Sequence, residues 1–214
     1  MKRQQSTLEE IGNAITHGMG AIFSIVAWIL MLNWSSGQDQ QTLKLFAVSI
    51  FGFSLLMLYT SSTLYHSITN LKAKRVFKIM DHCSIYLLIA GSYTPFVLIV
   101  LNGFWSNFLF FSVWGLAISG IVFKLYFTGR FKKVSTVIYI LMGWMAIFAY
   151  KPLVESIHIE GLYWVIAGGV VYTFGAIFYL FDKIHMFHMI WHIFVLGGSF
   201  LHFLAVVHYV IPYK

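Results

Sequence analysis

Residues 182–208 read DKIHMFHMIWHIFVLGGSFLHFLAVVH, an apolar stretch that carries a row of histidines. At the helical period, five polar side chains of this stretch fall on one stripe: His185, His188, His192, Ser199 and His202. The residues around the stripe are apolar enough to lie in a lipid bilayer, where polar groups are costly unless they have partners. Imidazoles one turn apart, such as those of His188 and His192, can bind one metal ion from a single helix face. Hydrogen bonds from these histidines to neighbouring helices are the alternative interpretation.

The composition is that of an integral membrane protein. Of the 214 residues, 59% are hydrophobic and only 10% are charged, whereas about a quarter of the residues in a soluble domain are charged. The apolar runs are long and continuous rather than short and alternating, so we expect membrane-spanning helices and not a β-barrel. Because the spans use nearly the whole chain, we predict a single all-α membrane domain over residues 1–214, with no soluble second domain.

We predict a bundle of seven transmembrane helices, at residues 13–34, 43–66, 79–101, 104–127, 135–150, 161–181 and 185–212. The connections are short, and turn signals at Asn102-Gly103 and Lys151-Pro152 support two of them. The first apolar run follows a polar segment (MKRQQSTLEE) and lacks a small-residue cleavage pattern, so we expect it to be retained rather than removed as a signal peptide. The single cysteine, Cys83, excludes an intrachain disulfide framework and any multi-cysteine metal site.

The net charge of +7 is best explained by orientation in the membrane. With the N-terminus inside the cell, eleven basic residues fall on the cytoplasmic side: Lys2, Arg3, Lys72, Lys74, Arg75, Lys78, Lys124, Arg130, Lys132, Lys133 and Lys183. Three fall on the opposite side: Lys44, Lys151 and Lys214. Cytoplasmic loops carry an excess of Lys and Arg, so we predict a cytoplasmic N-terminus and an extracytoplasmic C-terminus. There is no basic stripe outside the apolar runs, and we therefore expect no nucleic-acid partner.

In this topology, polar side chains from four spans meet in the cytoplasmic leaflet. They come from the starts of the first, third and seventh spans and the end of the second: Glu10, Asn13, His17, Ser62, His66, Asp81, His82, His185, His188 and His192. Intramembrane ionisable residues are functional candidates. Their convergence at one depth is a stronger indication of a site than any one of them alone.

A divalent metal ion, with zinc as the expected ion, is the most economical chemistry for this group. His66, His188 and His192 would be its ligands, and three neutral imidazoles leave the fourth tetrahedral position open to water, as in catalytic zinc sites. Such an ion activates the water and polarises a carbonyl. Asp81 would take the water's proton or orient the water, and Ser62 would hydrogen-bond the water or a developing oxyanion.

These residues also have structural interpretations. Ser62 can donate a hydrogen bond between helices, and Asp81 can pair with a Lys or Arg at the same membrane surface. His17 and its polar neighbours can mark a helix start, His82 is expected to be a neighbour of Asp81 rather than a ligand, and His202 a second polar contact deeper in the cavity. Haem is the competing cofactor, because paired histidines from different helices can clamp it, and another divalent ion that accepts histidine ligands can replace zinc.

Three polar segments occur in order along the chain: Glu10-Ile-Gly-Asn13-Ala-Ile-Thr16-His17, then Ser62-x-x-x-His66 followed by Asp81, then His188-Met-Ile-Trp-His192 followed by Ser199-Phe-Leu-His202-Phe. Together with the topology, they resemble the three signature regions of the progestin and adipoQ receptor family, to which the adiponectin receptors belong. The bacterial branch of that family is called hemolysin III. The similarity covers essentially the whole chain, and the short N-terminus without soluble extensions is similar to the bacterial members.

The resemblance implies a seven-helix bundle with an intramembrane zinc ion on His66, His188 and His192, an aspartate near the metal-bound water at Asp81, and a serine at Ser62. The wider superfamily includes alkaline ceramidases, so the implied activity is zinc-dependent hydrolysis of a lipid amide, which we extend to a lipid amide or ester. The implied location is the plasma (inner) membrane of a bacterium, spanned several times. Membrane lipids are the partners we predict, one of them as substrate, and the sequence indicates no protein partner.

Two other functions fit the same residues. The first is a non-enzymatic membrane protein, either a membrane-homeostasis sensor or a cytolytic pore-forming protein as the hemolysin name implies, in which zinc braces the helices. An open channel needs several helices with a continuous polar face, and the spans lack this feature. The second is an ion or proton transporter, which needs polar residues across the whole membrane, whereas these stop in one leaflet apart from His202.

Overall fold

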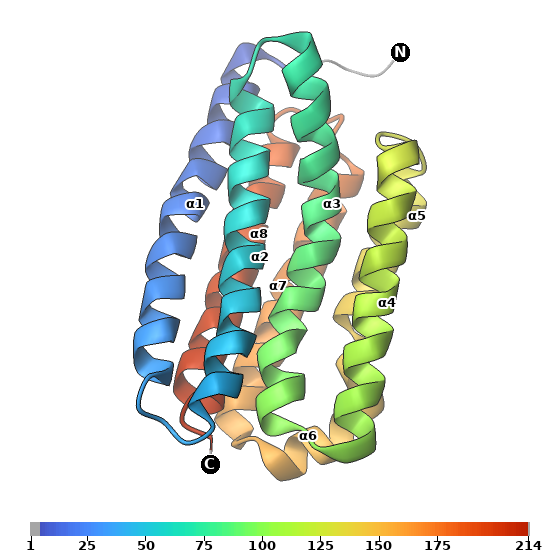
Figure 1. Ribbon diagram of the computed structural model, residues 1–214. Helices are drawn as coiled ribbons and strands as arrows, with labels where there is room; N and C mark the ends of the chain where they lie inside the picture. The colour runs from blue at the N-terminus through green and yellow to red at the C-terminus, as the bar shows by residue number, and fades with distance from the viewer. Residues whose placement is uncertain (1–4, 214) are drawn as a thin grey trace.

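The computed structural model describes residues 5–213, which form a helical bundle without strands (Figure 1). Its elements are α1 (Thr7–Ser35), α2 (Gln41–Ser67), α3 (Leu71–Pro95), η1 (Phe96–Val100), α4 (Gly103–Phe127), α5 (Lys132–Gly143), η2 (Met145–Ala149), α6 (Tyr150–Ser156), α7 (Ile159–Leu180), α8 (Phe187–Ala205) and η3 (Val206–Val210). Within these residues, seven helical segments are long and apolar enough to cross a membrane. The protein is therefore a multi-pass membrane protein, as predicted. Lys2, Arg3 and Lys214, which entered the charge count, lie outside the described residues.

The helices pack in a closed ring, in which the last span contacts the first. The first four spans pack each against the next, α5 packs against α4 and α7, α7 packs against α8, and α8 returns to α1. The start of α1 and the end of η3 lie at opposite ends of the bundle (Figure 1). This arrangement brings the end of α2 and the start of α8 to the end of the bundle where α1 begins.

Two helix starts are set by capping side chains. At α1, the Ser6 hydroxyl accepts the backbone N–H of Glu9 at 3.3 Å, and the Glu9 carboxylate accepts the backbone N–H of Ser6 at 2.9 Å, which forms a capping box. At α3, the Asn70 side chain accepts two backbone N–H groups of the first turn. As a result α3 begins at Leu71, earlier than the predicted residue 79, and the basic stretch predicted as a connection is helical instead.

The fifth span is interrupted. α5 ends at Gly143, and the 3-10 turn η2 and the short helix α6 continue the span as far as Ser156, beyond the predicted end at residue 150. The hydroxyl of Tyr93 in α3 donates to the carbonyl of Gly143 at 2.7 Å and accepts the N–H of Ala146 at 3.0 Å. Backbone groups inside a bilayer must find protein partners, so Tyr93 stabilises the interruption.

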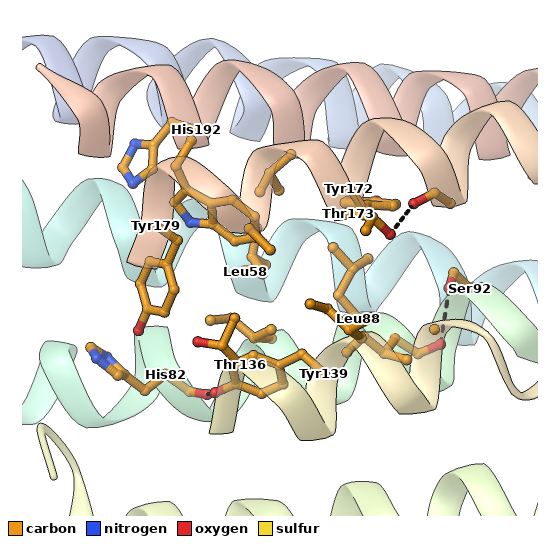
Figure 2. A pocket seen from close by; sticks show the side chains of 18 of the residues that line it. Leu58, His82, Leu88, Ser92, Thr136, Tyr139, Tyr172, Thr173, Tyr179 and His192 are labelled. Atoms are coloured by element: carbon orange, nitrogen blue, oxygen red, sulfur yellow. Dashed lines mark hydrogen bonds between the residues drawn. The ribbon is translucent and has the colours of Figure 1, made fainter. Parts of the chain in front are cut away.

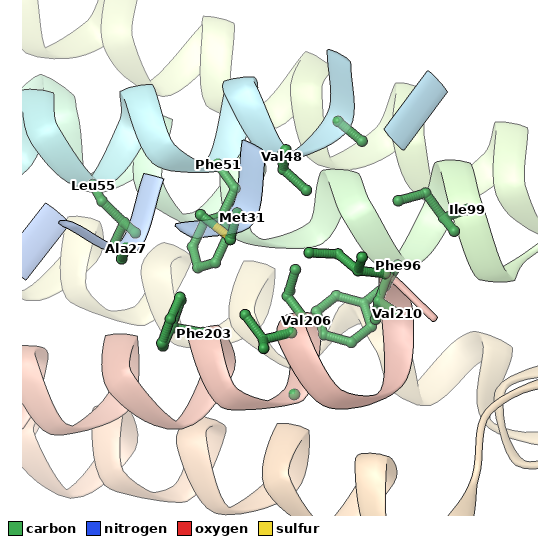
Figure 3. Packing of buried hydrophobic residues seen from close by; sticks show 14 of the residues in the cluster. Ala27, Met31, Val48, Phe51, Leu55, Phe96, Ile99, Phe203, Val206 and Val210 are labelled. Carbon is green, nitrogen blue, oxygen red and sulfur yellow. The ribbon is translucent and has the colours of Figure 1, made fainter. Parts of the chain in front are cut away.

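Apolar packing fills the end of the bundle where α2 begins and α8 ends. Figure 3 shows Met31, Phe51, Phe96 and Val206 from four segments packed against one another, all of them buried. Large apolar side chains also cover the outside of the bundle, where Ile22 is 67% exposed. Such a surface is suited to contact with lipid chains.

Candidate metal centre

Three histidines meet at the end of the bundle where α1 begins. His66 lies in the last turn of α2, and His188 and His192 lie one turn apart at the start of α8. The centre of the His66 ring is 5.2 Å from those of both His188 and His192, which are 4.7 Å from each other. One nitrogen from each ring lies within 4.8 Å of the other two. The three histidines predicted from the sequence are thus brought together.

The nitrogen atoms of this cluster fit a metal ion. Nε2 of His66 and Nδ1 of His188 are buried and have no hydrogen-bond partner among residues 5–213. A buried polar atom without a partner costs about 1–3 kcal/mol. An ion held between the rings would remove this cost at the ligating nitrogens, and three imidazoles are a ligand set that zinc accepts. The cluster is therefore a buried site that could bind a metal.

A cavity of about 100 Å³ extends from His188 and His192 into the bundle, with walls from α1, α2, α3, α5, α7 and α8. Figure 2 shows His192, Tyr179 and His82 at one end and Ser92 and Thr173 towards the other. Most of the surface between them is apolar. The histidines thus form the polar end of a largely apolar chamber.

Of the two predicted catalytic residues, Asp81 lines this cavity and Ser62 does not. The Asp81 side chain lines it, and its Oδ2 lies 3.4 Å from Nδ1 of His82. Ser62, one turn before His66, does not line it, and its buried hydroxyl has no partner in the described part of the chain. The hydrogen bond that joins α2 and α3 here is made by the neighbouring Ser61, whose hydroxyl lies 3.2 Å from that of Ser84.

Two further histidines, His17 and His202, lie near the site. His17 of α1 is buried and stacks on His192, with ring centroids 3.5 Å apart and planes 10° from parallel. Both its nitrogens lack hydrogen-bond partners within residues 5–213. His202 lines the cavity deeper in the bundle, and its Nε2 donates to the carbonyl of Val165 at 3.2 Å. Neither belongs to the group of converging ligand nitrogens.

His185 does not continue the stripe of α8, contrary to the prediction. Met186 has a left-handed backbone (φ 64°), and α8 begins only at Phe187. Glu9 of α1 accepts the N–H of Met186 at 2.9 Å and lies 3.4 Å from Nδ1 of His185. The turn before α8 is therefore fixed against α1. His185, whose side chain is 57% exposed, does not belong to the group of converging ligand residues.

The contacts of α1 with the clustered histidines were not predicted from the sequence. Oε2 of Glu10 lies 2.6 Å from Nδ1 of His66, and both the carbonyl of Asn13 and the hydroxyl of Thr16 lie 3.2 Å from Nδ1 of His192. The sequence predicts that Glu10, Asn13 and His17 share one helix face and converge on this site, with a helix start as the alternative interpretation. It does not predict which histidine nitrogens they contact.

Comparisons with known proteins agree with this architecture. The sequence model of the family described as "Haemolysin-III related" matches residues 5–203. "Hemolysin-3" of Bacillus cereus is 49% identical over 208 residues, covering 97% of this chain and 94% of that protein. "Hemolysin-3 homolog" of Bacillus subtilis (strain 168) is 47% identical over 205 residues, covering 94% of each.

More distant relatives are eukaryotic. "Adiponectin receptor protein" of Drosophila melanogaster is 26% identical over 224 residues, covering 91% of this chain and 49% of that protein. "Monocyte to macrophage differentiation factor" of Homo sapiens is 28% identical over 208 residues, covering 94% of this chain and 84% of that protein. Since the family match spans nearly the whole seven-helix bundle, the chain belongs to the haemolysin-III-related family of membrane proteins, to which the adiponectin receptors are related.

Proposed function

We propose that this protein is a zinc-dependent hydrolase that cleaves an amide or ester bond of a membrane lipid. One observation carries the proposal: the nitrogens of His66, His188 and His192 converge, and two of these residues, His188 and His192, line a cavity whose walls are mostly apolar. A lipid likewise combines a polar amide or ester linkage with long apolar chains. The bond to be cleaved would lie at the histidines and the chain in the cavity.

The residues around the histidines suit the chemistry of hydrolysis. A zinc ion on the three imidazoles would activate a water molecule and polarise the substrate carbonyl. Asp81, whose carboxylate lines the same cavity, would accept a proton as the water oxygen adds to the carbonyl carbon. Asp81 would then return that proton to the leaving nitrogen or oxygen as the C–N or C–O bond breaks. The products are a fatty acid and an amine or alcohol, and water is the sole co-reactant.

Ser62 has a supporting role in this proposal. Its buried hydroxyl has no partner within the described residues and lies one turn before His66. We assign to it a hydrogen bond to the water or to the oxyanion that develops on the carbonyl oxygen.

The rest of the bundle offers space for an apolar chain. A second cavity of about 270 Å³ shares Ser92, Tyr93, Trp144 and His202 with the first. It lies beside the interrupted fifth span and is lined mainly by apolar side chains. With the N-terminus in the cytoplasm, a lipid would enter laterally from the inner leaflet of a bacterial plasma membrane and extend its chain towards the opposite leaflet.

Elemental analysis and turnover assays test this function together. The purified protein is expected to carry zinc and to hydrolyse a ceramide or a phospholipid in vesicles. Asp81→Asn should lower turnover by about 10²–10⁴-fold while zinc content and folding stay unchanged. Asp39→Asn, the same change at an exposed connection, is the matched control. A zinc-loaded protein with no turnover on any ceramide-like or phospholipid substrate would contradict the proposal.

The names of the two Bacillus relatives favour a second function, since both refer to haemolysis. In this case the protein is a cytolytic pore former or a non-enzymatic membrane-homeostasis sensor, and zinc braces α2 against α8. Asp81→Asn would then change little, whereas His66→Ala would destabilise the bundle. Release of a dye from liposomes by the wild-type protein measures the lytic activity directly.

A further inference from the structure

The polar face of α1 contacts two of the three clustered imidazoles from outside, although α1 supplies none of the converging ligand nitrogens. Oε2 of Glu10 lies 2.6 Å from Nδ1 of His66, and the carbonyl of Asn13 lies 3.2 Å from Nδ1 of His192. The two contacts leave the Nε2 atom of each ring facing away from α1. Residues of α1 therefore contact the Nδ1 atoms of His66 and His192 without being ligands themselves.

The chemistry of these partners decides which nitrogen of His192 carries the proton. A backbone carbonyl only accepts hydrogen bonds, so Nδ1 of His192 must donate to Asn13. The nearby hydroxyl of Thr16 directs its own proton to backbone carbonyls of α1, at 2.9 and 3.0 Å, and is likewise an acceptor for the ring. Nε2 of His192 is then the unprotonated nitrogen, the form that ligates a metal.

The same assignment follows for His66. The other carboxylate oxygen of Glu10 accepts from Nζ of Lys74 at 2.9 Å. A carboxylate paired with an ammonium group offers only acceptor oxygens, so we assign the proton between Glu10 and His66 to Nδ1 of the ring. The Asn13 amide could donate to the same nitrogen, but at 3.5 Å this contact is much longer than the 2.6 Å to Glu10. Nε2 of His66 then holds a free lone pair, and this is the buried atom that lacks a partner in the described chain.

We propose that Glu10 is the positioning residue of the metal centre. It holds the His66 ring in the Nδ1–H form with Nε2 directed at the ion, and Lys74 of α3 fixes its carboxylate. Histidine ligands of metals commonly donate their other N–H to a carboxylate or carbonyl, and loss of such a partner costs about 10–100-fold in metal affinity. The proposal rests on the metal site of the proposed function, and it does not depend on the identity of the substrate.

A purely structural role predicts a different behaviour. The side chains of Glu10 and Lys74 are 25% and 26% exposed, and partly exposed ion pairs add little to folding stability. Removal of the Glu10 charge should therefore change the folding of the metal-free protein only slightly. Its main effect should be on the affinity and geometry of the bound ion.

The test uses Glu10→Gln in the full-length protein, purified and reloaded with Zn²⁺ or Co²⁺. Competition with a chelator should show Zn²⁺ binding weaker by about 10–100-fold, and the visible absorption bands of bound Co²⁺ should shift. The thermal unfolding of the metal-free variant should match that of the wild type. Glu155→Gln, the same change at an exposed site on α6, should alter none of these quantities.

The outcomes separate this inference from the proposed function. Unchanged Zn²⁺ affinity and an unchanged Co²⁺ spectrum in Glu10→Gln would overturn the positioning role, as would a loss of metal-free stability alone. A wild-type protein that binds no metal would overturn both proposals, whereas one that binds metal without lipid turnover overturns only the hydrolase. If Glu10→Gln does not fold, Lys74→Met serves instead. It should weaken Zn²⁺ binding by a smaller factor, and wild-type affinity in that variant would overturn the inference.

Discussion

His188 differs from the other two clustered histidines in its surroundings. His66 and His192 each have Nδ1 engaged by α1, whereas Nδ1 of His188 is buried without a partner in residues 5–213. The ring of His188 contacts mainly other rings, those of His66, His192 and Tyr179. A bound ion would therefore be the principal polar partner of this side chain.

Replacement of His188 by alanine should strip the metal from the purified protein. Two imidazoles from different helices are a much poorer site than three, because zinc in proteins usually has at least three protein ligands. The measurement is zinc per chain by elemental analysis. His208→Ala removes an exposed histidine from the opposite end of the same span and should keep full occupancy. Full zinc retention in His188→Ala would refute its assignment as a ligand.

The sequence was sufficient to predict the three clustered histidines, but not their outer contacts. His188 and His192 share a helix face through their spacing, and alternation of the spans brings His66 to the same end of the bundle. The contact between Glu10 and His66 depends on the packing of α1 against α2, which hydrophobic patterning does not specify. The assignment of catalytic roles to Asp81 and Ser62 stays a prediction.

The close contact of α3 with α4 depends on a small residue. A Cβ atom at Gly120 of α4 would lie 2.3 Å from the ring of Tyr86 in α3, which is fully buried. At Gly115 of the same helix, nothing lies within 4 Å of the corresponding position. Small residues let helices approach closely in membranes, so only one of these two glycines is required by packing.

Gly120→Ala should therefore destabilise the protein, whereas Gly115→Ala should not. The Gly120 variant should lose about 1–3 kcal/mol through overpacking against Tyr86, and Gly115→Ala should be neutral or gain up to about 1 kcal/mol from reduced chain entropy. Reversible unfolding in detergent micelles measures both. Equal effects of the two substitutions would show that the α3–α4 contact is looser than described.

Element boundaries differ from prediction where polar residues cap or break a helix. Hydropathy identifies the apolar part of a span, so it missed the first turns of α3 that Asn70 caps. It also missed the late start of α8, because the left-handed Met186 and its contact with Glu9 depend on tertiary packing. At Gly143 the helix breaks inside an apolar run, where a partner from α3, Tyr93, makes the interruption tolerable.

The packing inside the bundle differs between its two ends. The histidine cluster lies where α1 begins, and the apolar packing of Met31, Phe51 and Val206 fills the other end. The start of α1 and the end of η3, the first and last of the seven candidate spans, lie at opposite ends of the bundle. The distribution of Lys and Arg predicts that the end with the histidine cluster faces the cytoplasm.

Reporter fusions at the C-terminus test this orientation. Alkaline phosphatase fused after residue 214 should be active in a bacterial host, since it folds only outside the cytoplasm, and a fluorescent protein that folds only in the cytoplasm should stay dark at the same site. Both reporters fused after Gly129, between α4 and α5, should give the reverse pattern. A fluorescent C-terminal fusion with inactive phosphatase would invert the predicted topology.

The placement of the clustered histidines also constrains how the protein is made. His66 is synthesised before His188 and His192, and a stretch longer than half of the 214 residues separates it from them. While the ribosome is still producing α7, the insertion machinery handles a chain that holds only one of these three rings. Capture of an ion by all three rings would therefore have to follow the synthesis of α8, and a truncated product without α8 would lack two of the rings.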